Sequence, residues 1–442
     1  MPLVEKDGET VPKTTKIASK ASRSGRTSQP AVSKDWQSLS RILLDMNSPV
    51  LKSRPDLERT TGLGRSIVSQ QVEIGIELKL LTEGKFGESK GGRAPRLIEF
   101  NKNLGYLLIA ELGATGMSVA CTDLCGSIHE MSEISIDISV GPEKVLKEIE
   151  KFFDKFRLKN GDSLWGIGIG LPGPVEFAKG VPMSPPIMPG WDKYAVRERF
   201  ESRYGAPVWI DNDVNLMALG ETRLNQDKKH EELIYIKIGT GIGAGMISTK
   251  RLHRGALGSA GDIGHIAISE PSEVSCRCGN FGCLEAVAGG AALARNAMIA
   301  VEKNESSFLA ERFKRNKILT GKDVTDGARS GDVWSVEAVT GAGRQVGQVL
   351  ATLINFFNPS LVIIGGGVSS AGDLLLASIR ETVYRRSLPL ATRDLEIRLG
   401  DLDDRAGLRG ASEMVLSELL SADILKQWVK LGKPQIPLAY NL

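Results

Sequence analysis

A strand–turn–strand pattern that occurs twice, about 130 residues apart, constrains the fold of this chain more than any other feature. In each copy an apolar strand, residues 106–112 or residues 233–238, leads into a glycine- and threonine-containing turn and then into a second apolar strand. The turns read ELGAT (111–115) and GTGIG (239–243). Apolar strands at 165–170, 207–210 and 361–364 alternate with helical stretches such as 142–157. The repeat therefore predicts an α/β body of two related lobes that face a cleft.

The composition is that of a globular protein. Of 442 residues, 41% are hydrophobic and 25% are charged, which excludes a collagen-like, disulfide-scaffold or globally disordered chain. At roughly 150 residues per domain, this length predicts about three domains. We expect a cytoplasmic protein with no membrane partner, because the sequence contains neither a long apolar run nor an apolar segment near Met1.

The formal net charge of +3 is divided unevenly along the chain. Residues 1–105 carry a net charge of +6 and the remainder carries −3. This asymmetry favours a polyanionic partner for the N-terminal part, although a solvated basic tail would have the same signature. Residues 1–34 are rich in Lys, Ser and Thr and poor in apolar residues, so we expect them to form a disordered basic tail.

Residues 35–103 have the pattern of a winged helix-turn-helix domain. The first helix begins near Asp35, and its apolar residues repeat every three or four positions. Pro55 opens a second helix over residues 55–61, and the turn TGLG (61–64) leads into a third helix over about residues 65–79. Two short strands around a basic loop at residues 84–93 then complete the wing.

The start of the third helix would face a DNA groove, and the tip of the wing would lie along a minor groove or screen phosphates. The candidate DNA contacts are Arg65, Ser66, Ser69, Gln70, Lys90 and Arg93. The alternative is an ordinary surface helix in a small α-helical domain. One such module reads a single half-site, so we expect a homodimer or a homotetramer on operator DNA.

Three of the five cysteines cluster as Cys276-x-Cys278-x4-Cys283, and His265 lies eleven residues upstream. In a cytosolic chain such clustering argues for a metal rather than for disulfides. Three thiolates and one imidazole are the donor set of a closed, structural zinc site, in which the second imidazole nitrogen would remain for a ligand hydroxyl. The alternative is a group of reduced, buried cysteines.

Polar residues also follow a predicted strand, as Asp211-Asn212-Asp213 directly after residues 207–210. This edge of an α/β sheet is where ligands bind, and an aspartate there could act as general base toward a sugar hydroxyl. The glycine turns at 239–243 and 365–367 could accommodate phosphates and a nucleoside. The alternative in each case is ordinary turn chemistry.

Taken together, the body at about residues 104–420 resembles the ROK family of repressors, sugar kinases and related open reading frames. The matching motifs are GIGIGLPGP (166–174), PGW (189–191), DNDVN (211–215), GTGIGAG (239–245), AGDIGH (260–265), CRCGNFGCLE (276–285) and NPSLVIIGGGV (358–368). AGDIGH together with CRCGNFGCLE is highly specific. The N-terminal winged helix resembles the extra module of the family's transcription factors.

This resemblance implies an actin-like, two-lobed sugar-kinase fold preceded by a winged helix-turn-helix. The first lobe would span 104–225, completed by 396–430, and the second would span 226–395 and hold the zinc site. The implied sugar-binding residues are Gly173, Asn212, Asp213, Asp262, His265 and Glu285. The implied zinc ligands are His265, Cys276, Cys278 and Cys283. In kinase members the residue matching Asp213 is the catalytic base, and Mg-ATP would contact Gly113, Thr115, Thr240, Gly241, Gly243 and Gly366.

The chain departs from the kinase pattern at three positions. Glu111 replaces an aspartate and Ala114 replaces a glycine in the first phosphate turn, and Asp262 replaces the glutamate of AGEIGH. These changes weaken the expectation of Mg-ATP binding and of phosphoryl transfer. The main hypothesis is therefore a sugar-responsive transcriptional repressor that a sugar or sugar derivative releases from DNA. The alternative is an ATP-dependent sugar kinase that also binds DNA.

Overall fold

The computed structural model describes residues 35–440 except 49, 88–93, 225–229, 269–272 and 403–404. The expected basic tail at residues 1–34 lies outside this part of the chain. Residues Trp36–Leu442 form one compact unit. Among the described residues, no helix has the length and apolar character needed to cross a bilayer.

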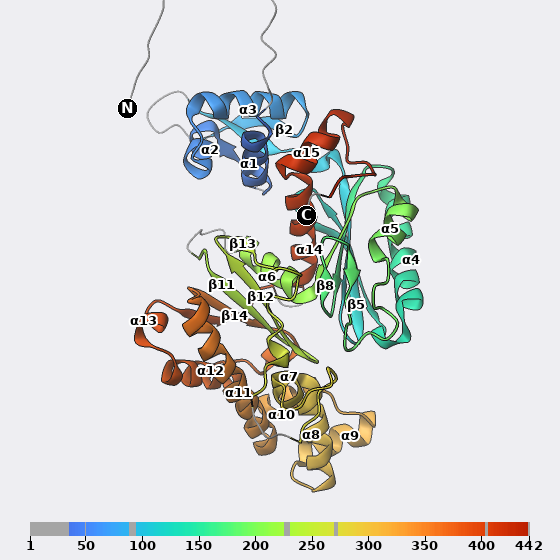
Figure 1. The fold of residues 1–442 in the computed structure, drawn as a ribbon, viewed down its shortest axis with the longest axis vertical. Coiled ribbons are helices and arrows are strands. Elements are labelled where there is room, and N and C mark those ends of the chain that lie inside the picture. The colour runs from blue at the N-terminus through green and yellow to red at the C-terminus, as the bar shows by residue number, and fades with distance from the viewer. Residues whose placement is uncertain are drawn as a thin grey trace, which may run out of the picture. The chain divides into compact units, whose positions relative to one another are not determined.

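A winged helix-turn-helix begins the compact unit (Figure 1). Its elements are α1 (Trp36–Met46), β1 (Lys52–Ser53), α2 (Arg54–Thr61), α3 (Arg65–Glu77), β2 (Leu81–Phe86) and β3 (Arg96–Phe100). The two wing strands and the three helices match the sequence expectation. The short strand β1 was not expected; it pairs with β3 and completes a sheet of order β1-β3-β2.

Local sequence explains the geometry of this module. Ser53 caps α2, since its hydroxyl accepts a hydrogen bond from the Asp56 amide while the Asp56 carboxylate accepts one from the Ser53 amide. Gly62, at φ 66°, ends α2 in a left-handed conformation. Gly75 lies inside α3, where a Cβ atom would lie 2.6 Å from Leu81 Cδ1. Glycine therefore allows α3 to pack closely on the wing.

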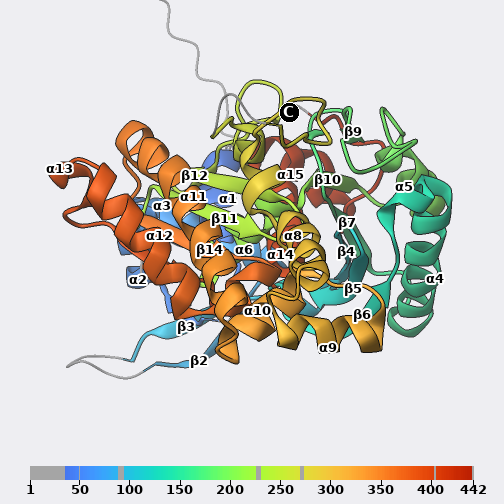
Figure 2. The same ribbon diagram turned by 90° about the horizontal axis from the view of Figure 1, so that it is seen from below.

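The first lobe is built on a five-stranded sheet of order β10-β7-β4-β5-β6. Its strands are β4 (Tyr106–Leu112), β5 (Gly116–Asp123), β6 (Ile128–Ser135), β7 (Leu164–Leu171) and β10 (Val208–Asn212). The helices α4 (Pro142–Asn160) and α5 (Val196–Tyr204) cover one face (Figure 2). β4 is buried on both faces: Leu108 packs toward α4, whereas Leu107 packs into the core on the opposite face.

The second lobe is built on a sheet of order β13-β12-β11-β14-β15. Its strands are β11 (Leu233–Ile238), β12 (Ile242–Ser248), β13 (Arg251–Leu252), β14 (Leu361–Gly365) and β15 (Glu396–Leu399). The helices α8 (Gly290–Glu302), α10 (Gly321–Arg329), α11 (Val333–Phe357) and α12 (Asp373–Arg386) share a core with one face. Because β15 pairs with β14, the chain returns to the first sheet after this strand, and not at residue 396 as expected.

Two helices lie between the sheets. α6 (Asp213–Leu224) packs Val214 and Met217 against the second sheet, whereas α14 (Ala406–Leu419) packs on β4 and β7 of the first. The two helices meet backbone to backbone. A Cβ atom on Gly410 would lie 1.6 Å from the Leu216 carbonyl oxygen, and one on Gly220 would lie 2.1 Å from that of Ala406. The two lobes are therefore joined through a contact that leaves no room for side chains.

The C-terminal segment joins the winged helix to the first lobe. α15 (Ala422–Trp428) contacts α1, and the Trp428 ring meets Trp165 of β7 edge to face, with 5.0 Å between the ring centroids. Further along, Tyr440 packs edge to face on Trp209 of β10. One continuous hydrophobic core therefore includes the three helices of the winged helix-turn-helix, α14 and α15.

The close contact of α6 and α14 predicts that Gly410→Ala destabilises the protein. The added methyl group would overlap the Leu216 carbonyl, and we expect a loss of about 3 kcal/mol, seen as a lower midpoint of thermal unfolding. Gly341→Ala in α11 is the matched control, because its Cβ atom would meet only the end of the Arg344 side chain. Alanine is the better helix former, so this variant should be neutral or up to about 1 kcal/mol more stable. Equal midpoints for the two variants would contradict the packing argument.

Candidate functional site

The junction of β10 and α6 holds two of the residues that were predicted to bind sugar. The Asn212 side-chain oxygen accepts a hydrogen bond from the Val214 amide at 3.0 Å and so caps α6. Its side-chain nitrogen donates to the Gly173 carbonyl, also at 3.0 Å. The cap therefore fixes Asn212 and draws the loop after β7 toward the start of α6.

Asp211 serves this junction as a structural group. One carboxylate oxygen accepts from the Asn215 side chain at 2.8 Å, and the other accepts from the Arg254 guanidinium at 2.7 Å. The same guanidinium lies 3.7 Å above the Phe177 ring centroid. Arg254 was not singled out from the sequence, since it lies in a segment without a recognisable motif.

Asp213, the candidate base, is paired with a lysine that sequence analysis also missed. The Asp213 side chain is nearly buried, and the residue is only 3% exposed. Its Oδ1 accepts from the Val214 amide at 2.9 Å, and its Oδ2 accepts from Lys237 Nζ at 2.5 Å. Lys237 lies in β11 between Gly243 of β12 and Gly365 of β14. The sequence did contain a signal for Lys237, because it is the only charged residue in the otherwise apolar strand LIYIKI.

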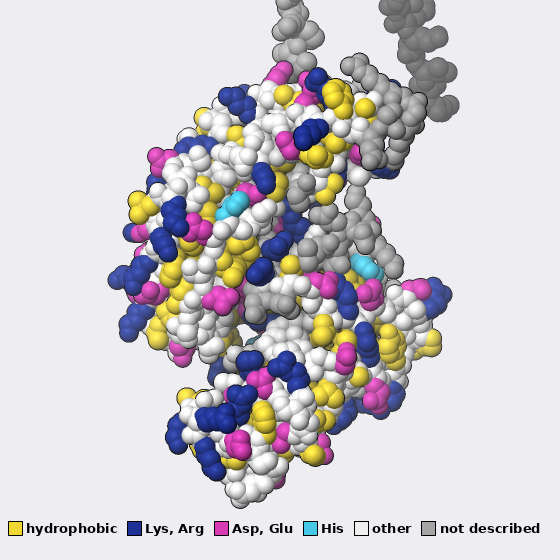
Figure 3. Space-filling model, turned by 180° about the vertical axis from the view of Figure 1, so that it is seen from behind, with side chains coloured by type: hydrophobic (Ala, Val, Ile, Leu, Met, Phe, Trp, Pro, Cys, Tyr) yellow, Lys and Arg dark blue, Asp and Glu magenta, His cyan; other side chains and the backbone are white. Residues whose placement is uncertain are grey.

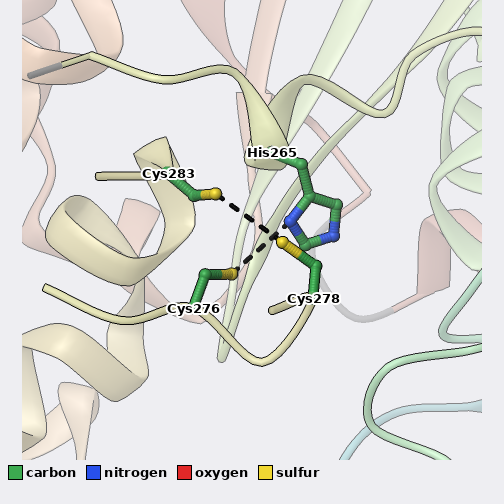
Figure 4. A group of neighbouring side chains, drawn as sticks. All are labelled: His265, Cys276, Cys278 and Cys283. Atoms are coloured by element: carbon green, nitrogen blue, oxygen red, sulfur yellow. Dashed lines mark hydrogen bonds between the residues drawn. The ribbon is translucent and has the colours of Figure 1, made fainter. Parts of the chain in front are cut away.

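The four predicted metal ligands lie together (Figure 4). Cys276 Sγ is 3.5 Å from His265 Nδ1, and Cys278 Sγ is 3.7 Å from Cys283 Sγ. All four candidate ligand atoms lie within 4.8 Å of one another, so the group could hold a metal ion. His265 Nε2 lies on the side of the ring away from Cys276, 3.8 Å from Asp262 Oδ1.

The protonation of these thiols follows from their surroundings. Burial raises the pKa of the Cys276 thiol to about 12. Burial also opposes ionisation of Cys278, but hydrogen bonds from the Asn280 backbone and from the neighbouring thiols bring its pKa below the usual value. A metal would therefore displace at least the Cys276 proton at neutral pH, and its affinity would fall as the pH falls.

Glu285 connects the metal-ligand cluster to the second glycine turn. Its Oε1 lies 3.7 Å from Cys276 Sγ, and its Oε2 accepts from the Ile242 amide at 3.4 Å. A cavity of about 270 Å³ opens beside it; the lining residues include Ile187, Thr240, Gly241, Arg277, Glu285 and Arg295. The predicted sugar residue Glu285 thus faces a hollow next to the turn.

The glycine turns lie on different sheets. The first closes with a hydrogen bond from the Gly113 amide to the Gly116 carbonyl, at 2.8 Å. Just before this turn, the Glu111 carboxylate is directed at α14, where a Cβ atom on Gly407 would lie 2.1 Å from it. The second turn closes from the Gly239 amide to the Gly241 carbonyl, at 2.9 Å.

Gly366 lies beside this second turn, since a Cβ atom on it would lie 2.7 Å from the Ile238 carbonyl. Thr240, Gly241, Gly243 and Gly366 therefore belong to one region of the second lobe, whereas Gly113 and Thr115 belong to the first sheet. Their roles toward Mg-ATP stay predictions.

Three of the four candidate DNA contacts in the third helix lie at the surface. Arg65, Ser66 and Gln70 are exposed and Ser69 is half-buried, whereas Val68 and Val72 pack into the core. The wing residues Lys90 and Arg93 lie outside the described part of the chain. Residues 1–34, also outside it, carry +4 of the N-terminal charge of +6. On the face in Figure 3, acidic and basic side chains are interspersed and the surface is hollowed between the lobes.

Comparison of the sequence with known proteins gives one consistent result. The profile of the ROK family matches residues 108–418. A xylose repressor from Caldicellulosiruptor bescii is 32% identical over 375 residues, which cover 84% of this chain and 92% of the repressor. A glucokinase from Halalkalibacterium halodurans is 33% identical over 309 residues, which cover 69% of this chain and 93% of the kinase.

Among solved structures, too, a transcriptional regulator matches more of this chain than a kinase does. A ROK family transcriptional regulator, described as a homologue of the E. coli MLC protein, has a TM-score of 0.74 at 26% identity. The similarity covers 89% of this chain and 98% of the regulator. A ROK family glucokinase from Streptomyces griseus, solved with glucose and AMPPNP, has a TM-score of 0.63 at 29% identity. This similarity covers 70% of this chain and 99% of the kinase.

Proposed function

The chain belongs to the ROK family, and from this premise we propose that it is a sugar-responsive transcriptional repressor. The observation that carries the proposal is the extent of the match. The xylose repressor from C. bescii aligns over 84% of this chain, whereas the glucokinase from H. halodurans aligns over 69%. The three-helix module with the exposed Arg65, Ser66 and Gln70 precedes the segment that the family profile matches. We further propose that two or four copies bind operator DNA, one module per half-site.

The sugar would bind at the start of α6 and along the metal loop. Asp213 and Asn212 would accept and donate hydrogen bonds to hydroxyl groups from one side, with Gly173 orienting Asn212. Hydrogen bonds to hydroxyl groups from the opposite side of the sugar would come from Asp262, His265 Nε2 and Glu285. Polar groups fixed in this way suit a neutral polyol, because each hydroxyl both donates and accepts. D-xylose and D-glucose are the first candidates, since the names of the relatives refer to them.

We also propose that the ion held by the Cys3His cluster is zinc. In a tetrahedral site with Zn–S bonds of about 2.3 Å, neighbouring sulfurs are about 3.8 Å apart, and sulfur and nitrogen about 3.5 Å. The corresponding distances of 3.7 Å and 3.5 Å fit this geometry. Four protein ligands close such a site, so its role is structural: it would stiffen the loop and fix the orientation of the His265 ring.

Phosphoryl transfer is the second candidate, favoured by the glucokinase relatives and the intact second glycine turn. Two contacts count against it. The Asp213 oxygen that would take a hydroxyl proton accepts a hydrogen bond from Lys237, and Glu111 is directed at α14. Lys237 would have to leave Asp213 before that oxygen could act as a base. We therefore propose that this site binds a sugar and does not phosphorylate it.

The first test concerns the metal. Elemental analysis should find about one zinc per chain, and Cys278→Ser should lose both the metal and the binding of sugar, because the loop that holds His265 would lose its anchor. Cys121→Ser is the control, since Cys121 is a buried thiol outside the cluster and its loss should leave the zinc content unchanged. Zinc retained at full occupancy in Cys278→Ser would disprove the ligand assignment.

The second test concerns DNA. In gel shifts with the protein's own upstream region, we expect a specific complex that saturating D-xylose or D-glucose dissociates. Arg65→Ala should weaken the sugar-free complex by about 5- to 100-fold, as expected for loss of a direct base or phosphate contact. Arg393→Ala removes the same charge from the second lobe and should have little effect. A complex that none of a panel of pentoses, hexoses and N-acetylhexosamines dissociates would contradict the proposal.

The third test separates binding from catalysis. Asp213→Asn should weaken sugar binding by about 10-fold or more, because it removes a charged hydrogen-bond acceptor from a nearly buried position. Asp394→Asn, at an exposed site in the second lobe, serves as the control. Calorimetry measures both affinities, and release of ADP from ATP measures turnover. Sugar-dependent ADP release by the wild type, abolished in Asp213→Asn, would instead support the kinase.

A further inference from the structure

Helix α6 extends from the proposed sugar site to the DNA-binding module. Its first turn carries Asn212 as the cap and Asp213 as the residue paired with Lys237. Its last turn carries Arg223, which donates a hydrogen bond to the carbonyl of Asn47, directly after α1 of the winged helix. A helix of twelve residues is about 18 Å long, so one rigid element connects the two functional ends.

Arg223 joins three parts of the molecule. Besides the Asn47 carbonyl, its guanidinium donates to the Cys125 carbonyl after β5, at 3.3 Å, and pairs with Glu413 of α14. Both charged side chains are about four-fifths buried. Burial lowers the pKa of Arg223 to about 10, which leaves the guanidinium charged at neutral pH. A planar, multidentate cation of this kind is sensitive to small shifts of its partners.

The opposite end of α6 lies at the proposed sugar site. Asp213 belongs to the helix and Lys237 belongs to the second sheet, so their ion pair ties the start of α6 to the second lobe. A sugar hydroxyl that binds Asp213 competes with Lys237 for the same carboxylate oxygen. The Gly220–Gly410 contact then makes α6 and α14 respond together, because their backbones touch without intervening side chains.

The side chain of Asn47, unlike its backbone carbonyl, is buried in an unfavourable setting. The Asn47 residue is 4% exposed, and neither polar atom of its carboxamide has a hydrogen-bond partner among the described residues. Buried amide groups without partners are costly, so a small displacement that pairs this carboxamide would be favoured. The end of α1 is therefore suited to a second arrangement.

Building on the repressor function proposed above, we propose that α6 transmits sugar binding to the DNA-binding module and that Arg223 is the contact through which it does so. Sugar at Asp213 loosens the tie to Lys237, α6 and α14 shift, and the Arg223–Asn47 contact changes. α1 then turns α3 away from the geometry that matches the operator. Arg223 touches neither sugar nor DNA and is a positioning residue.

The test compares coupling in the wild type and in Arg223→Lys. Lysine keeps the charge beside Glu413, but as a point charge it cannot also hold both carbonyls. Fluorescence anisotropy with a labelled duplex of the upstream region gives the DNA affinity with and without saturating D-xylose, or D-glucose if that is the active sugar. The ratio of the two affinities is the coupling factor. We expect this factor to fall at least about fivefold, while calorimetry shows sugar affinity within about twofold of the wild type.

Arg199→Lys is the matched control. Arg199 is a similarly buried arginine of the first lobe, and its ion pairs with Glu143 and Glu150 join α5 to α4 and do not involve α6. It should keep the wild-type coupling factor. Equal coupling in Arg223→Lys and Arg199→Lys would overturn the role of Arg223. A wild type that binds DNA but does not respond to any sugar would instead overturn the repressor proposal, and the coupling with it.

If Arg223→Lys does not fold, a second variant tests whether α6 signals to the DNA-binding module. Lys237→Met frees the Asp213 carboxylate without touching Arg223, and should weaken DNA binding at least about threefold when no sugar is present. Unchanged sugar-free affinity in this variant would show that the start of α6 does not signal to the DNA-binding module, which also overturns the proposal.

Discussion

The backbone contact between α6 and α14 is the constraint on which the rest of the structure depends. Gly220 and Gly410 let the two helices cross so closely that the carbonyl oxygens of one lie where Cβ atoms of the other would be. α14 is buried on the first sheet and α6 on the second, so this one contact sets the relation of the two lobes. Side chains can repack, but two touching backbones cannot, so any movement of one lobe relative to the other would have to pivot about this contact.

The proposed sugar site is arranged around that contact. Asn212 caps α6 and Asp213 is its first residue, and Lys237 reaches Asp213 from the second sheet. On the other side, Glu285 is hydrogen-bonded to the start of β12 and lies next to Cys276 of the metal loop. The residues that would hold a ligand thus come from separate elements: from α6, which contacts both lobes, and from the strands and the metal loop of the second lobe. Binding at such a place can be converted into relative movement.

The winged helix-turn-helix is integrated with the body. Its core continues into that of α14 and α15, with Trp428 packed on Trp165 of the first sheet. Arg223 adds a buried polar contact to the end of α1. A module held in this way has its orientation set by the body, as the proposed repressor would require for a small sugar to change its binding of DNA.

The sequence by itself determined the local features of this protein. β4 and β11 begin and end as predicted, Gly62 ends α2 as the turn pattern predicts, and the Cys/His spacing brings four ligand atoms together. These depend on periodicity and on residues close in the chain. Only the tertiary structure decided that β15 belongs to the second sheet, that Lys237 pairs with Asp213 and that Arg223 contacts Asn47. The last two contacts join residues 24 and 176 positions apart. Such contacts depend on how sheets and helices stack, which no local pattern records.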